Sequence, residues 1–208
     1  MSKEERDRII EEADELYNSG RIYESIEVMK KHKNSFDKDM YIGMMLDIGF
    51  ELDEKDDVRC AFECFKEAAK MGDITAMKML GTYYGSGKGC KQDNRECFYW
   101  YKKAYDAHPY SALALNLAYC YLNCYLNGEA IEKDLNYPLS LFKEAMQCDD
   151  YDIRKDAQEG YEIVINEINN AEKKEKWKNR GKTALNVLGA FAQGYANASS
   201  QYDDDYDD

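Results

Sequence analysis

Hydrophobic side chains recur at the spacing of an α-helix in the middle of the chain, and a glycine-rich segment interrupts them. Ala76, Leu80 and Tyr84 lie at positions i, i+4 and i+8, so they share one helix face. The Gly-Ser-Gly-Lys-Gly sequence of residues 85–89 ends this pattern and predicts a turn. Asp93 is then placed to cap a second helix. The apolar stripe of that second helix consists of Cys97, Tyr101 and Ala104.

This second stripe and its preceding aspartate occur three times. The three sets are Asp57, Ala61, Phe65 and Ala68; Asp93, Cys97, Tyr101 and Ala104; and Asp134, Pro138, Phe142 and Ala145. The sets are 36 and then 41 residues apart, whereas the first helices repeat after 37, which indicates a four-residue insertion within residues 123–133. A period of this length is typical of a solenoid. Because one hairpin cannot bury its apolar face alone, we predict an all-α fold, a right-handed α-α superhelix of stacked helix-turn-helix repeats.

The best-defined unit carries a recognisable family pattern. Residues 76–89, followed by Asp93 and by Trp-Tyr-Lys-Lys-Ala at residues 100–104, closely resemble the Sel-one-like repeat, a relative of the tetratricopeptide repeat. On this resemblance, residues 37–147 form a repeat domain. Its units are expected at about residues 40–72, 76–108 and 113–147.

The ends of the repeat domain are less regular. In the unit at 40–72 the second helix fits the family, but the first offers only Ile42, Gly43 and Leu46 and lacks the glycine-rich turn. Residues 1–36 resemble a tetratricopeptide-like hairpin with Gly20 at its turn. Residues 148–170 predict a capping helix. Its apolar stripe consists of Ala157, Tyr161, Val164 and Ile168.

Residues 171–208 differ in composition, with a basic start and an acidic end, and predict a basic amphipathic helix followed by an acidic tail. The candidate docking stripe of this helix consists of Trp177, Leu185, Leu188, Phe191 and Tyr195. Such a helix could fold back on its own repeats, dock on a partner or a second copy, or lie on an anionic membrane surface. These three alternatives remain open.

The charge balance narrows the class of partner. The chain has 41 acidic and 28 basic side chains, a net charge of −13, while 44% of its residues are hydrophobic. We therefore expect a folded protein with a basic protein or peptide partner and no nucleic acid. Two uncharged stretches, 107–128 and 183–202, contain too many Asn, Gln and Ser residues for a membrane helix. A membrane partner is thus not expected, and the oligomeric state is left open.

The resemblance implies a non-enzymatic adaptor or scaffold that binds a peptide or helical segment in its concave groove. The alternative is a peripheral membrane or self-assembly module driven by the helix at 177–195. Groove-facing positions lie beside the packing stripe of each first helix. The candidates are Met79, Thr82, Ser86, Asn116, Tyr119 and Asn123. Some of these side chains could instead complete the interface with the next repeat.

No constellation predicts catalysis, a cofactor or a metal. The pairs Cys60/Cys64 and Cys120/Cys124 have helical spacing, but they fall on different kinds of helix, so we interpret them as small buried hydrophobic residues. Gly87-Lys88 and Gly181-Lys182 lack the earlier glycine of a phosphate-binding loop. Neither of the two histidines lies in a nucleophile pattern.

The number of cysteines and the N-terminal sequence indicate the cellular compartment. Seven cysteines is an odd number without framework spacing, which predicts reduced thiols. Some exported members of the family that this chain resembles staple neighbouring helices with paired cysteines, but the positions expected for this, around Ala69/Met77 and Tyr105/Leu113, carry none. The charged N-terminus lacks the apolar stretch of a secretory signal. We therefore expect a cytoplasmic protein.

Overall fold

A computed structural model describes the backbone of residues 2–129 and 134–200, and the side chains of these ranges up to residue 176. By its contacts the chain divides into two units, Met1–Tyr161 and Glu162–Asp208. Each unit is described by itself. The predicted docking stripe, Trp177, Leu185, Leu188, Phe191 and Tyr195, lies outside the side chains that the structure describes.

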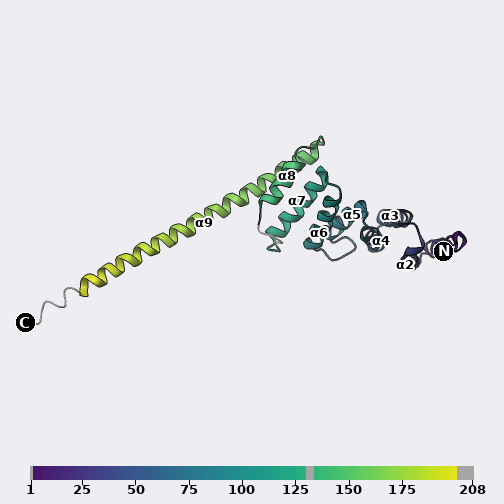
Figure 1. Ribbon diagram of the computed structural model, residues 1–208, viewed down its shortest axis with the longest axis horizontal. Helices are drawn as coiled ribbons and strands as arrows, with labels where there is room; N and C mark the ends of the chain where they lie inside the picture. Colours follow the sequence, from purple (N-terminus) through teal and green to yellow (C-terminus); the bar gives the residue numbers. More distant parts are fainter. Residues whose placement is uncertain (1, 130–133, 201–208) are drawn as a thin grey trace, which may run out of the picture. The chain divides into compact units, whose positions relative to one another are not determined.

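The described residues form helices and no strand, which confirms the all-α prediction. The elements are α1 (Lys3–Asn18), α2 (Ile22–Lys31), the short 3₁₀ helix η1 (Lys33–Ser35), α3 (Lys38–Glu54), α4 (Val58–Lys70), α5 (Ile74–Ser86), α6 (Asn94–Ala107), α7 (Ser111–Leu126), α8 (Asn136–Ala145) and α9 (Tyr151–Ser200). Within the first unit, successive helices pack as antiparallel hairpins that stack in chain order (Figure 1). This arrangement is an α-solenoid.

Aspartates set the starts of four successive helices. Asp37, Asp57, Asp73 and Asp93 are the N-caps of α3, α4, α5 and α6, and the carboxylate of each accepts a hydrogen bond from a backbone N–H of the first turn. The predicted cap Asp93 accepts from the N–H groups of Arg95, at 2.9 Å, and Glu96, at 3.1 Å. An N-cap satisfies donors that have no partner within the helix. The aspartates thus fix where these four helices begin.

The predicted glycine-rich turn lies between α5 and α6. Gly87 ends α5 in the left-handed conformation, with φ of 72°. Gly89 also has a positive φ, and a Cβ atom at this position would collide with the carbonyl oxygen of Val58 at the start of α4. The turn of one repeat therefore lies directly against the preceding repeat, and only a glycine allows this approach.

Small residues in the first helices make room for rings of the second helices. A Cβ atom on Gly81 in α5 would lie 2.5 Å from the Tyr101 ring of α6, and one on Gly49 in α3 would lie 2.9 Å from the Phe65 ring of α4. The rings of Phe65, Tyr101 and Phe142 occupy equivalent repeat positions, and all three are buried. Each hairpin is therefore held by a large side chain seated against a small one.

The first helix of the first repeat differs from the prediction. Its buried stripe is Tyr41, Met45, Gly49 and Leu52, whereas the expected residues Ile42, Gly43 and Leu46 are only half-buried. The stripe is displaced because α3 connects to α4 through the three-residue linker 55–57 in place of the glycine-rich turn. Gly49 is consequently the equivalent of Gly81.

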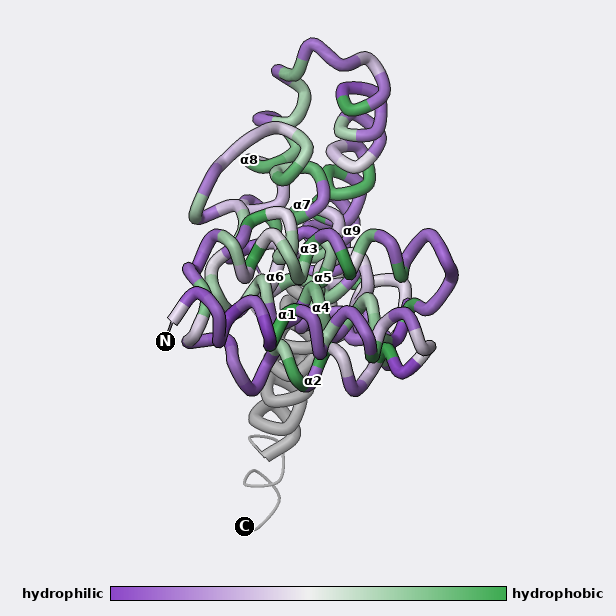
Figure 2. Tube along the Cα trace, turned by 90° about the vertical axis from the view of Figure 1, so that its right-hand side faces the viewer, coloured by the Kyte–Doolittle hydropathy of each residue, from purple (hydrophilic) through white to green (hydrophobic). Residues whose placement is uncertain are grey.

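Hydropathy changes along the repeats, as Figure 2 shows: α1 is mainly hydrophilic and α7 mainly hydrophobic. Nine residues of α7 are buried, against two of α1. α7 carries no charged side chain, because other helices cover much of its surface. The hydrophobic core of the stack is therefore more extensive around α7 than around α1.

The change of composition after Asn170 is not a helix boundary. α9 runs without interruption from Tyr151 to Ser200, so the expected division between a capping helix at 148–170 and a separate helix from 171 does not occur. Residues 171–176 are Ala, Glu and Lys, which are strong helix formers and continue the helix. Among the described residues, no helix combines the length and hydropathy that a membrane span requires.

Candidate functional site

A hollow of about 290 Å³ lies between α5 and α7. Thr82 and Ser86 reach it from α5, and Asn116, Tyr119 and Asn123 reach it from α7. The structure thus places five of the six predicted groove residues around one cavity. The remaining lining residues are Gly81, Gly85, Cys97, Tyr101 and Cys120. We refer to this cavity as the α5–α7 groove.

The sixth predicted residue, Met79, does not line the groove. The α5 contribution begins at Gly81 and ends at Ser86, so the cavity lies beside the C-terminal half of this helix. Met79 is half-buried on the preceding turn. Sequence periodicity predicts the correct helix face here but does not show how far the cavity extends along the helix.

The groove residues differ in how fully their polar atoms are engaged. The hydroxyls of Thr82 and Tyr101 form a hydrogen bond of 2.8 Å, and the Tyr119 hydroxyl donates to the Asp156 carbonyl of α9 at 2.7 Å. The side-chain amides of Asn116 and Asn123 make no hydrogen bond to any residue in the described part of the chain. Each amide offers two donors and one acceptor. They are the groups in the groove with unused hydrogen-bonding capacity.

One edge of the groove is acidic. The pKa of Tyr119 is raised, first by burial and then by the carboxylates of Asp156 and Glu159. Both carboxylates belong to the first turns of α9, where their side chains are exposed. The pKa of Tyr101 is also raised, chiefly by burial. The groove therefore combines neutral hydrogen-bonding groups with a negative potential at the α9 side.

Cysteines form part of the groove floor. Cys97 of α6 and Cys120 of α7 are joined as a disulfide, with Cα atoms 6.4 Å apart. The prediction that all thiols are reduced is therefore wrong for this pair. The pair also differs from the staple positions considered from the family pattern, because Tyr105 and Leu113 lie on the same two helices, α6 and α7, but at other positions along them. Sequence spacing could not reveal which faces of α6 and α7 meet.

The other cysteines are free thiols, two of them buried. Burial raises the pKa of Cys64 to about 12, and the pKa of Cys60 is raised to about 11, again mainly by burial. Both thiols therefore stay protonated at neutral pH, a form that neither attacks electrophiles nor binds metals well. Within residues 2–129 and 134–176, no three or more His, Cys, Asp or Glu side chains form a metal-binding group.

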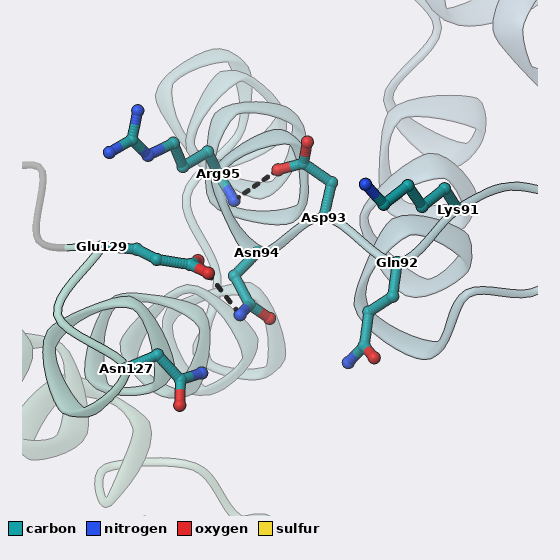
Figure 3. Close-up of a pocket in the computed structure, with 7 residues that line it drawn as sticks. All are labelled: Lys91, Gln92, Asp93, Asn94, Arg95, Asn127 and Glu129. Carbon is teal, nitrogen blue, oxygen red and sulfur yellow. Dashed lines mark hydrogen bonds between the residues drawn. The ribbon is translucent and has the colours of Figure 1, made fainter.

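A second, more polar pocket of about 500 Å³ lies where α6 begins and α7 ends (Figure 3). Two cations, Lys91 and Arg95, and two carboxylates, Asp93 and Glu129, are among its lining residues. Both carboxylates already have structural partners, since Asp93 caps α6 and Glu129 accepts a hydrogen bond of 3.2 Å from the Asn94 amide. The carboxylates of this pocket therefore serve the start of α6 and its contact with the end of α7, and none of the lining residues is a Ser, Thr or Cys nucleophile.

Sequence reasoning did not predict five residues that line the groove, namely Gly81, Gly85, Cys97, Tyr101 and Cys120. The sequence alone assigned Gly81 and Tyr101 to packing between helices and Gly85 to the glycine-rich turn. A signal was present in the Gly-Thr-Tyr-Tyr-Gly sequence at 81–85, where two small residues four apart leave one side of the helix open. The two cysteines gave no comparable signal.

Stacked two-helix repeats with an open groove between successive first helices define an α-solenoid of the repeat-protein class. The Sel1 repeat model matches residues 40–73, 74–108 and 111–150, which together are more than half of the chain. The protein therefore belongs to the Sel1 repeat family.

Solved structures resemble the chain at low identity. One is a protective antigen of uropathogenic Escherichia coli strains with an SLR fold, 23% identical, with a TM-score of 0.49 over 69% of this chain. Another is a Sel1 repeat protein from Oxalobacter formigenes, 25% identical, with a TM-score of 0.43 over 66% of this chain. The chain spans only 29% and 54% of these two proteins. No curated protein matches the sequence.

Proposed function

We propose that this protein is a non-enzymatic adaptor that binds a peptide segment in the α5–α7 groove. The observation that carries the proposal is the pair of Asn116 and Asn123 amides, which line the cavity without a hydrogen-bond partner among the described residues. Sel1 repeat solenoids commonly act as scaffolds for protein interactions. A bound peptide would satisfy amide groups that the fold itself leaves open to solvent.

The spacing of the two amides favours an extended ligand. Asn116 and Asn123 are seven residues apart on α7, which corresponds to about 10.5 Å along a helix. Three residues of an extended chain cover about 10 Å. Each asparagine can donate to a carbonyl and accept from an N–H, so two amides can bind the backbone of one extended peptide. Recognition of this kind tolerates many peptide sequences.

The charge around the groove favours a basic partner. Residues 1–170 contain 34 acidic and 22 basic side chains, and Asp156 and Glu159 lie beside Tyr119 at the groove edge. Opposite charge accelerates association and disfavours acidic competitors. Lysine or arginine residues flanking the segment bound by Asn116 and Asn123 would meet these carboxylates.

A peptide library tests this proposal. Peptides selected from a random phage-displayed library against the whole protein should be enriched in Lys and Arg. The double variant Asn116→Ala, Tyr119→Ala should bind the selected peptides at least about tenfold more weakly, because it removes an amide and a hydroxyl from the groove. Fluorescence anisotropy with synthetic peptides measures this loss.

A matched double variant provides the control. Asn127→Ala with Tyr23→Ala makes the same chemical changes at exposed positions outside the groove, and it should leave peptide affinity unchanged. Equal affinity of the groove variant and the unmodified protein would contradict the proposal. Selected peptides without a basic excess would contradict the charge argument alone.

The adaptor is proposed to act in the cytoplasm, a reducing compartment in which its five free cysteines would stay as thiols. The disulfide between Cys97 and Cys120 argues in the opposite direction, because disulfides persist mainly in oxidising compartments. Cell fractionation tests the proposed location: recovery of the protein from the cytoplasmic fraction supports it, and recovery from an oxidising compartment would overturn it.

A further inference from the structure

The helix α3 carries a surface stripe that is equivalent to the predicted groove positions of α5 and α7. In α5, the groove residue Thr82 directly follows the small buried residue Gly81. Gly49 holds the same small position in α3, where a Cβ atom would meet the Phe65 ring. This alignment makes Asp47, Phe50 and Glu54 in α3 equivalent to Met79, Thr82 and Ser86 in α5, and to Asn116, Tyr119 and Asn123 in α7. We call Asp47, Phe50 and Glu54 the α3 stripe.

Phe50, at the centre of the α3 stripe, is a large aromatic side chain that stays 39% exposed. Its ring meets the Phe65 ring edge-on, with ring centres 5.1 Å apart, and Phe65 meets Tyr83 of α5 in the same manner at 5.6 Å. These aromatic contacts lead from α3 to the helix that carries Thr82. The hydroxyls of Thr82 and Tyr119 form hydrogen bonds, whereas the exposed part of Phe50 gains only from apolar contact.

Carboxylates flank Phe50 on both sides along the helix. Asp47 lies three residues before Phe50 and Glu54 four residues after it, so the three side chains share one face. Both carboxylates are exposed, and neither forms an ion pair or a hydrogen bond with residues 2–129 or 134–176. Lys55 is the closest cation along the chain, but its Nζ atom pairs with Glu51 at 2.5 Å. The α3 stripe is therefore an apolar surface between two negative charges that the fold does not neutralise.

The helix α1 adds negative charge beside α3. Because the hairpins stack in chain order, α1 is the neighbouring first helix (Figure 1). Ala13, 36 residues before Gly49, is the small buried residue of α1, and the equivalent stripe positions include Glu11 and Asp14. Both carboxylates are exposed, and Arg8, one turn earlier, pairs with neither of them among the described residues. The equivalent positions of α5 and α7 contain no charged side chain, so negative charge is concentrated at the α1–α3 end of this face.

We propose that the α3 stripe binds a large apolar side chain of a partner peptide, and that lysine or arginine residues next to this side chain meet Asp47 and Glu54. This inference rests on the proposed function, because the same peptide is expected to continue from the α5–α7 groove. Charge complementarity selects the occupant: a peptide without basic residues would cover Phe50 but leave both carboxylates desolvated and unpaired. The partner segment is therefore one in which basic residues flank a large apolar residue.

A double-mutant cycle between protein and peptide tests this inference. Peptides selected from the random library should share a Leu, Ile, Met, Phe or Trp residue with Lys or Arg beside it. Phe50→Ala in the protein, and alanine in place of that apolar residue in a synthetic peptide, should each weaken binding about tenfold in fluorescence anisotropy. The two changes together should weaken it little more than either alone, because both remove the same contact. Losses that multiply would overturn the inference.

A charge variant tests the two carboxylates while the Phe50 ring stays in place. Asp47→Lys with Glu54→Lys should weaken binding about tenfold and remove the basic residues from newly selected peptides. Glu24→Lys with Asp106→Lys is the control, because it makes the same change of net charge at exposed positions of the second helices α2 and α6. Tyr99→Ala is the control for Phe50→Ala, since it removes an aromatic ring that is 50% exposed. Both controls should leave peptide affinity unchanged.

Failure of this inference is distinguishable from failure of the proposed function. If Asn116→Ala with Tyr119→Ala weakens binding but the α3 variants do not, the α5–α7 groove holds the peptide and the α3 stripe does not. If none of these variants weakens binding, the proposed function fails as well. A molar mass that falls on Phe50→Ala would assign the stripe to a second copy of the chain and would also overturn the inference. If circular dichroism shows that Phe50→Ala loses helix, the charge variant at two exposed positions decides the outcome.

Discussion

Asp53 shows how a single residue links two repeats. Its carboxylate, at the end of α3, accepts a hydrogen bond from the Tyr83 hydroxyl of α5 and lies 2.6 Å from Lys88 Nζ in the glycine-rich turn. Burial raises the pKa of Asp53, but the hydrogen bonds from Lys88 and Tyr83 outweigh this effect, so the net pKa is below its usual value. The ionised form is therefore favoured in the folded protein.

We expect Asp53→Asn to lower the free energy of unfolding by about 1 kcal/mol at pH 7, since Lys88 is partly exposed and its attraction is screened. A carboxylate with a lowered folded-state pKa stabilises the fold above its unfolded pKa, about 3.9, and this stability is lost as the pH falls. Urea unfolding at pH 7 and pH 3 measures the difference, which should be smaller at pH 3 than at pH 7. Asp47→Asn, at an exposed position of the same helix, is the control; an Asp53→Asn effect independent of pH would contradict the explanation.

The sequence predicts which residues line the groove better than it predicts their hydrogen-bond partners. Periodicity placed Thr82, Ser86, Asn116, Tyr119 and Asn123 on one surface, because helical spacing determines which residues share a face. It could not predict that Thr82 bonds to Tyr101 and Tyr119 to Asp156 while the two amides lack partners. These differences depend on contacts between helices far apart in sequence.

At the scale of helices, the close approach of α5 and α6 depends on Gly81. A Cβ atom there would lie 2.5 Å from Cδ2 and 2.9 Å from Cγ of the buried Tyr101 ring. Gly43 in α3 offers a contrast, because nothing lies within 4 Å of the position its Cβ would take. Both glycines lie within helices, but a larger residue would clash with Tyr101 at position 81 and would meet no neighbour at position 43.

Gly81→Ala should therefore lower the free energy of unfolding by about 1–3 kcal/mol, because the methyl group overpacks the hairpin. Gly43→Ala should raise it by up to about 1 kcal/mol, because alanine favours the helix and meets no neighbour. Denaturant unfolding of both variants measures the two values. Changes of the same sign would contradict this account of hairpin packing.

Helix prediction succeeded where the repeat pattern was complete. The second helices α4, α6 and α8 follow from the recurring Asp and apolar positions. The buried stripe of α3 was predicted at the wrong residues, because this repeat lacks the glycine-rich turn by which its first helix could be aligned with those of the other repeats. The long helix α9 was divided at Asn170 because composition changes there, although helix propensity does not.

At the scale of the molecule, stability is distributed along the stack. In the first unit most contacts join helices that follow one another along the chain, but α2 packs against α1 and α4 and has less contact with α3. Repeat proteins of this kind derive stability from each repeat and its immediate neighbours. Distant parts of the chain are therefore expected to contribute little to the stability of the central repeats.

Deletion of residues 171–208 should accordingly leave the urea midpoint of the repeats nearly unchanged. The same variant tests the alternative function assigned to the stripe at 177–195. If that helix drives self-assembly or membrane attachment, deletion changes the molar mass from light scattering or the co-sedimentation with anionic liposomes. No change in either measurement removes that alternative, and a large fall in the urea midpoint would contradict the local distribution of stability.

The contact between Gly89 and Val58 has a consequence for the evolutionary history of such chains. The glycine lets the turn of one repeat rest on the start of the second helix before it, and Asn94 holds the position equivalent to Val58 in the next repeat. A duplication of residues 74–108 would therefore supply both halves of a new junction in one genetic event. Chains of this architecture can therefore gain whole repeats while each new junction uses the same residue contacts as the existing ones.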